Sequence, residues 1–227
     1  MAKIAKRLKE GEASIDSDHK YSLADAINLI KGLPKAKFDE TVDIAIRLGV
    51  DPAKADQMVR GTLTMPNGTG KVKRILAFAK GEKIREAEEA GADFVGQEEL
   101  VAKVEGGWLD FDAVVATPDI MGSVGKLGRL LGPRGLMPNP KSGTITFAIG
   151  NVIKEIQAGK VEFKVDKGGI IHTLIGKVSF SQQALVENGE ALLDSIRRLK
   201  PASAKGSYLR GVTLSSTMGP SVKINIA

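Results

Sequence analysis

The strongest constraint on the fold is a change in hydrophobic pattern along the chain. Towards both ends, apolar and polar residues alternate, as in Thr41 to Leu48 and again in Lys160 to Val165. Between them, Val72 to Ala79 and Phe111 to Ala116 are almost continuously apolar. Alternation is typical of antiparallel strands with one solvated face, whereas continuous apolar runs suit strands buried on both faces. The sequence therefore predicts two kinds of sheet.

Helical segments complete both patterns. In the outer segments, Ser22 caps a helix that ends at Gly32, and a longer helix runs from Ser181 to Leu199. In the middle segment, helices over Glu82 to Ala90 and Glu98 to Val104 alternate with short strands. That alternation favours a parallel sheet with crossover helices.

These patterns predict one α+β domain, an antiparallel sheet with helices, that is split between both chain ends. A doubly wound α/β domain is inserted into it. The predicted boundaries are residues 1–67 plus 160–227 for the split domain and 68–159 for the insertion. Such insertions favour relative motion of the two domains.

Two tight turns are predicted in the last third of the chain. Asp166 to Gly169 follows the alternating strand, and Ile170 to Val178 is expected to pair back as a hairpin. Met218 to Pro220 separates the last two strands. The same reasoning predicts a second N-terminal strand over Val59 to Met65.

Charge and composition limit the partners. The 227 residues carry a net charge of +6 and a pI near 9.4, which makes a polyanion a plausible partner. Aromatic residues are only 4%, so binding of RNA would depend on phosphates, sugars and shape rather than base stacking. Cysteine is absent, and no apolar stretch reaches the roughly 20 residues of a membrane span. We therefore expect a cytoplasmic protein with no membrane partner.

The segments that resemble nucleotide-binding motifs each lack required residues. Gly68-Thr69-Gly70-Lys71 is flanked by Met65 and Val72, where a phosphate-binding loop needs Gly and Ser or Thr. The turn at Gly81 lacks a dinucleotide fingerprint. The two histidines, His19 and His172, have no second ligand at metal spacing, and we expect no cofactor, metal or catalytic site. His172 remains open between an ordinary strand histidine and an RNA contact.

Three blocks are unusual for purely structural segments: 37–41, 131–140 and 213–220. The first joins a cation to an aromatic, the second is a rigid loop rich in Gly and Pro, and the third is rich in hydroxyls. Hydroxyls and exposed backbone groups suit contacts with phosphates and 2′-hydroxyls. The alternative for the third block is an ordinary edge strand.

These blocks carry a resemblance to a known family. The runs 37–42, 111–119, 128–141 and 216–222 all resemble the ribosomal protein L1 family of bacterial type, in order and at the expected spacing. The resemblance implies a split α+β domain with an inserted Rossmann-like domain, and no enzymatic activity.

The resemblance also implies a function. Members of this family are structural constituents of the large ribosomal subunit and bind ribosomal RNA of the mobile stalk near the tRNA exit site. The resemblance further implies that the chain assists release of deacylated tRNA from the exit site. It also implies repression of translation of its own operon, through binding to the operon mRNA.

Carried over by position, the family's RNA contacts fall on the split domain. They are Lys37, Phe38, Thr41, Lys167, Gly168, His172, Ser215, Thr217, Met218 and Gly219. Lys37 and Lys167 would contact phosphates, and Thr41, Ser215 and Thr217 would contact 2′-hydroxyls. Replacement of Thr217 by Val is expected mainly to weaken RNA binding and to leave the fold intact.

Overall fold

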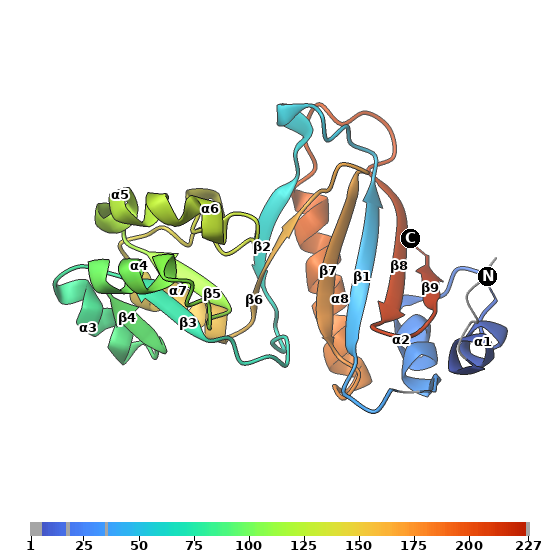
Figure 1. The fold of residues 1–227 in the computed structure, drawn as a ribbon. Helices are drawn as coiled ribbons and strands as arrows, with labels where there is room; N and C mark the ends of the chain where they lie inside the picture. The colour runs from blue at the N-terminus through green and yellow to red at the C-terminus, as the bar shows by residue number, and fades with distance from the viewer. Residues whose placement is uncertain (1–5, 17–18, 35, 226–227) are drawn as a thin grey trace. The chain divides into compact units, whose positions relative to one another are not determined.

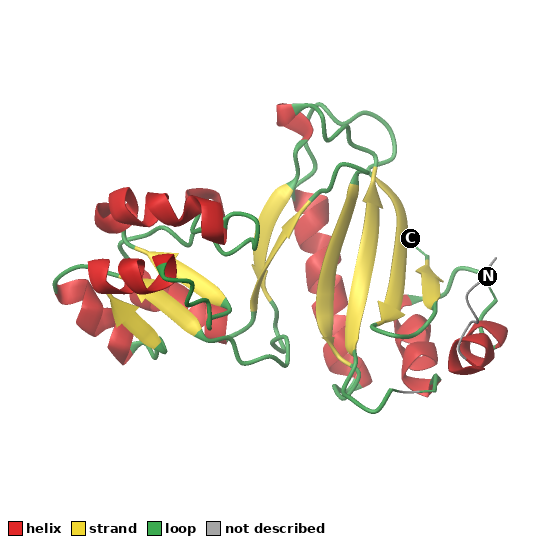
Figure 2. Ribbon diagram, viewed as in Figure 1, coloured by secondary structure: helices red, strands yellow, loops and turns green. Residues whose placement is uncertain are grey.

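The computed structural model describes residues 6–16, 19–34 and 36–225, and the chain forms two compact units. The outer unit consists of the chain up to Gly70 and from Val161 onward, and the central unit is Lys71–Lys160. Figure 1 labels the elements of both units, and Figure 2 shows that each contains helices and strands.

The outer unit is built on a four-stranded antiparallel sheet in the order β7-β1-β8-β9. Its strands are β1 (Thr41–Leu48), β7 (Ile170–Lys177), β8 (Leu209–Ser216) and β9 (Ser221–Ile224). Helices α2 (Leu23–Gly32) and α8 (Gln182–Arg198) cover one face. Alternate residues of β1, such as Ile44 and Ile46, pack with Ile27 and Leu185 in the core on that face. The alternate side chains of each strand project from the opposite face of the sheet.

The predicted Ser22 cap is confirmed, and Ser181 caps the longer helix in the same way. The Ser22 Oγ accepts a hydrogen bond from the Asp25 N–H at 3.2 Å, and the Ser181 Oγ accepts one from the Ala184 N–H at 3.1 Å. These bonds satisfy backbone donors that a helix start leaves without partners. Sequence patterning missed α1 (Lys6–Ala13), a short helix in which Gly11 is the buried residue among those described. One buried position gives no recognisable apolar face.

The prediction that the strand before Asp166 forms a hairpin with the strand after Gly169 holds at the turn and is wrong beyond it. Val165 pairs with Ile171 in an isolated bridge, and the Asp166 N–H donates to the Ile170 carbonyl at 2.9 Å. Beyond this point β6 (Lys160–Lys164) pairs with β2 (Arg60–Thr64), whereas β7 pairs with β1. The short 3-10 helix η1 (Ala55–Gln57) precedes β2. Alternation predicts a strand but does not choose its neighbour.

The central unit contains a parallel sheet in the order β4-β3-β5. Its strands are β3 (Ile75–Phe78), β4 (Phe94–Gly96) and β5 (Ala113–Ala116). Helices α3 (Glu82–Glu89) and α7 (Ile149–Gln157) pack on one face, and α4 (Glu98–Glu105), α5 (Met121–Val124) and α6 (Gly128–Leu131) pack on the other. Three 3-10 helices complete it: η2 (Pro118–Ile120), η3 (Gly125–Leu127) and η4 (Pro140–Ser142).

Strand β3 explains why its sequence is continuously apolar. Ile75 and Ala77 belong to the core beneath α3 and α7, whereas Leu76 and Phe78 belong to the core beneath α4, α5 and α6. The predicted strand nevertheless began too early, because Val72 is 98% exposed and precedes the sheet. A continuous apolar run marks burial on both faces only where helices cover both faces of the sheet.

Candidate nucleic-acid interface

The ends of β1 and β8 bring two of the unusual sequence blocks together. The Thr217 Oγ accepts a hydrogen bond from the Thr41 N–H at 2.9 Å and donates one to the Thr41 carbonyl at 3.2 Å. The Thr217 N–H also donates to that carbonyl at 3.0 Å. Residues 176 positions apart in sequence therefore form one site.

Two apolar side chains project from this end of the sheet. Phe38 is 54% exposed and Met218 is 52% exposed. We call Lys37, Phe38, Thr41, Thr217, Met218 and Gly219 the sheet-end cluster. It combines a cation, exposed apolar surface and hydroxyls, as recognition of RNA sugars and phosphates requires.

The Met218 turn is fixed from inside by Glu40, which is only 4% exposed. Burial raises the pKa of this carboxyl, but hydrogen bonds from Ser216 and from the Ala36 and Met218 N–H groups outweigh it and hold the pKa below its usual range. The carboxylate is therefore the resident form at neutral pH.

Gly219 owes its identity to packing within the protein. A Cβ at this position would lie 2.4 Å from the Ser216 Oγ, a distance that real side chains do not adopt. Gly219 is not among the glycines with positive φ. A larger residue at this position would therefore require the Ser216 side chain to move.

The middle of the open sheet face is defined by the strand register. Opposed residues in antiparallel strands project from the same face. One row across the sheet is His172, Ala45, Thr213 and Lys223, and the next is Leu174, Asp43, Ser215 and Ser221. A depression of about 510 Å³ is lined by residues of both rows, including His172 and Ser215. Two of the predicted contacts thus share one surface.

His172 is a strand histidine with an exposed side chain, not a core residue. Its side chain is 64% exposed, and its Nε2 lies 3.6 Å from the Asp166 Oδ2. Lys223 occupies the same row, and sequence reasoning missed it. The alternation of Ser221 and Lys223 with buried Val222 and Ile224 was the signal that could have identified it.

Lys167 and Gly168 lie in the turn at the far end of the sheet. The Asp166 Oδ1 accepts hydrogen bonds from the Gly168 and Ile170 N–H groups, both at 2.8 Å, and the Ile170 bond contributes most to the lowered pKa of Asp166. Gly169, with φ of +77°, is the residue whose conformation requires glycine here. The Asp166 carboxylate therefore fixes the backbone of the turn that presents Lys167.

The predicted contacts form two groups joined by the sheet face. Thr41 begins β1, and the Leu48 N–H at its other end donates to the Gly169 carbonyl at 2.8 Å. Seven residue steps of about 3.4 Å separate these ends by roughly 24 Å. The ten residues therefore span a surface suited to a structured nucleic acid rather than to a single nucleotide.

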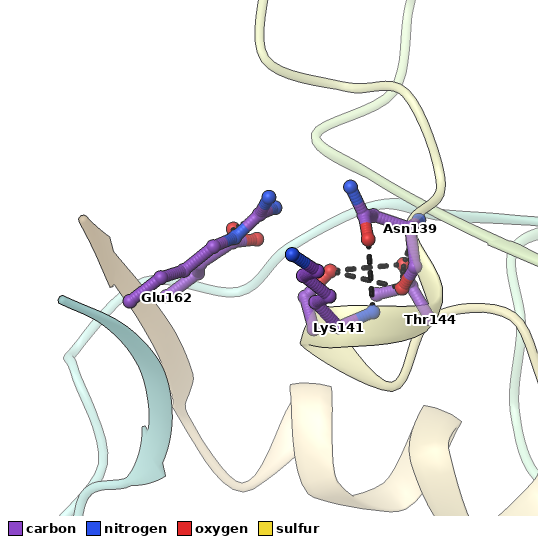
Figure 3. Close-up of polar contacts among 6 residues, drawn as sticks. Asn139, Lys141, Thr144 and Glu162 are labelled. Carbon is purple, nitrogen blue, oxygen red and sulfur yellow. Dashed lines mark hydrogen bonds and ion pairs between the residues drawn. The ribbon is translucent and has the colours of Figure 1, made fainter. Parts of the chain in front are cut away.

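Local hydrogen bonds fix the C-terminal end of the loop 131–140 in the central unit. The Asn139 Oδ1 accepts from the Lys141 N–H at 2.8 Å, and the Asn139 N–H donates to the Thr144 Oγ at 2.8 Å (Figure 3). The Ser142 Oγ donates to the Asn139 carbonyl at 3.2 Å. Helix α6 ends at Leu131, the first residue of the block expected as a loop, and the 3-10 helix η4 begins at Pro140, its last residue.

Within the described residues, no group of three or more His, Cys, Asp or Glu side chains could hold a metal ion. None of the helices in the described part of the chain is both long and apolar enough to cross a membrane.

Comparison with known families identifies the family of the chain. The sequence model of the ribosomal protein L1p/L10e family matches residues 29–220, a span that includes all ten predicted contacts. Proteins of this family are RNA-binding constituents of the large ribosomal subunit and are not enzymes. The resemblance inferred from the sequence is therefore confirmed, and the chain belongs to the ribosomal protein L1p/L10e family.

Proposed function

We propose that the outer unit binds ribosomal RNA of the mobile stalk, near the tRNA exit site, through its open sheet face and the two ends of that face. The observation that carries this proposal is the sheet-end cluster. Two sequence blocks from opposite ends of the chain meet there, and they expose Phe38, which follows Lys37 in the chain, and Met218. Exposed apolar surface that is gathered at one place and bordered by polar groups is typical of an interaction site.

The chemistry of the surface suits RNA. Lys37 and Lys167 would neutralise phosphates and release counterions. The Thr217 hydroxyl already accepts one hydrogen bond and donates its proton to the Thr41 carbonyl. Its remaining lone pair is an acceptor for a 2′-hydroxyl, which DNA lacks. Phe38 and Met218 would exclude water from these polar contacts.

The finer functions of the family follow as parts of the same proposal. The predicted Rossmann-like α/β insertion over residues 68–159 corresponds to the central unit, Lys71–Lys160, and the predicted split domain over residues 1–67 and 160–227 corresponds to the outer unit. On the ribosome, in the cytoplasm, the chain assists release of deacylated tRNA. It represses its own operon by binding mRNA that presents the same RNA shape to the sheet-end cluster.

Binding across a salt series tests the proposal. The full chain is titrated with a stalk ribosomal RNA fragment and with an RNA duplex of equal length. Recognition by the proposed surface predicts tight binding of the fragment that persists at moderate salt and clearly weaker binding of the duplex. Equal binding of both RNAs, lost steeply as salt rises, would show only a basic surface.

A further inference from the structure

We infer that Glu40 is a positioning residue for RNA binding: its buried carboxylate fixes the Lys37 segment and the Met218 turn in one arrangement. This inference rests on the proposed function and assigns a role to a residue that was not among the predicted contacts. Its charge alone argues for the opposite effect, because a carboxylate near a polyanion disfavours binding.

The two oxygens of Glu40 divide their bonds between the two segments. The Oε1 accepts a hydrogen bond from the Ala36 N–H at 2.6 Å, and the Oε2 accepts one from the Met218 N–H at 3.1 Å. The Ser216 side chain also hydrogen-bonds to this carboxylate. One side chain thus connects backbone on both sides of the sheet-end cluster.

The backbone of Glu40 is also held in place. Its carbonyl accepts a hydrogen bond from the Val178 N–H at 2.9 Å, which anchors the residue to the end of β7. The carboxylate therefore projects from a fixed point into the space between the two segments. Close packing of Gly219 against the Ser216 Oγ completes this arrangement.

The arrangement has the properties of preorganisation. Phe38 and Met218 are exposed and have little packing of their own to fix them. If the turn were mobile, RNA binding would have to order it, and the ordering would reduce affinity. A buried carboxylate with several donors fixes the turn before RNA arrives.

Replacement of Glu40 by Gln tests the role with almost no change in shape. Glutamine has one acceptor oxygen, so its amide nitrogen would face either the Ala36 or the Met218 N–H, donor against donor. One of the two segments is then released. A purely electrostatic role predicts unchanged or tighter RNA binding, because a negative charge is removed, whereas a positioning role predicts weaker binding.

Two variants serve as controls. Replacement of Glu187 by Gln removes the same charge from α8, where the carboxylate accepts hydrogen bonds from the side chains of Asn67 and Gln183. Replacement of Leu192 by Ala destabilises the same unit from its core without touching the turn, because Leu192 is fully buried in α8. Affinities are compared per folded molecule, at a temperature where every variant is folded.

The experiment measures affinity for the stalk RNA fragment and hydrogen exchange of the Ala36 and Met218 amides without RNA. We expect E40Q to bind at least about tenfold more weakly than the wild type, with faster exchange at one of these amides or at both. E187Q and L192A should bind as the wild type does.

Unchanged or tighter binding by E40Q would overturn the inference and leave the proposed function standing, provided that the wild type prefers the fragment to the duplex. Exchange at the Ala36 and Met218 amides that is no faster in E40Q than in the two control variants would also overturn it. If the wild type shows no preference for the fragment, the proposed function fails and the inference fails with it.

Discussion

Replacement of Thr217 by Val tests the sheet-end cluster most sharply, because Val matches the shape of Thr and lacks its hydroxyl. The change removes the hydrogen bond accepted from the Thr41 N–H and the one donated to the Thr41 carbonyl. Each such bond contributes about 0.5–1.5 kcal/mol. Both groups are exposed, so water replaces the lost partner and the expected loss of stability is about 1 kcal/mol. The backbone bond from the Thr217 N–H to the Thr41 carbonyl remains.

A loss of that size lowers the melting temperature by only about 2–4 °C for a chain of this length. The fold therefore stays intact, whereas RNA affinity should fall about tenfold because a 2′-hydroxyl loses its acceptor. Thermal melting and RNA titration at a temperature well below the transition separate the two effects. Replacement of Thr217 by Ser is the matched control, since it keeps the hydroxyl and should retain most of the affinity. A large drop in melting temperature with affinity per folded molecule unchanged would refute the reasoning.

Three further predictions concern the framework. Replacement of Asn188 by Asp, which loses the donor to the Gly68 carbonyl at 3.0 Å, should cost about 3 kcal/mol or more in urea unfolding; a loss below 1 kcal/mol would contradict it. Gly49→Ala should destabilise by about 1–3 kcal/mol, because its Cβ would lie 2.2 Å from a backbone oxygen, whereas Gly122→Ala, with nothing within 4 Å, should not destabilise. Folding lowers the pKa of the Glu40 carboxyl from its usual value of 4.5, so its contribution to the free energy of unfolding is present above pH 4.5 and is lost as the pH falls through the folded pKa. The free energy of unfolding should therefore decline less in E40Q than in the wild type over that pH range.

Much of the fold was predictable because periodicity reports which side of each element is buried. Ile44 and Ile46 identified the buried half of β1, and Ser181 identified the start of α8. Pairing was harder. The prediction paired β6 with β7 as a hairpin, whereas β6 pairs with β2 in the structure. The alternation of apolar and polar residues in β6 does not distinguish these two partners.

Helix α7 shows a different kind of omission. The sequence contained the signal for this helix, although the helix was not predicted. Its buried residues recur at helical spacing: Ile149, Val152, Ile153 and Ile156. Neither α5 nor α6 offered such a signal, because each is a single turn of four residues, too short to show helical periodicity.

The site was predictable as blocks but not as a geometry. The sequence indicated that 37–41 and 213–220 were unusual, yet it did not show that the Thr217 hydroxyl is already engaged with Thr41. Nor did it single out Glu40, because a buried carboxylate between two segments looks like any other acidic residue at the start of a strand. Such roles depend on contacts between residues far apart in the chain.

Amide chemical-shift mapping of the full chain with the stalk RNA fragment tests the central claim most directly. We expect added RNA to shift the amide resonances of residues 37–41, 167–172 and 215–219. Amides on the outer face of α8, such as Glu187 and Glu190, should stay unchanged. Shifts confined to the central unit, or spread evenly over all basic surfaces, would contradict recognition by the open sheet face.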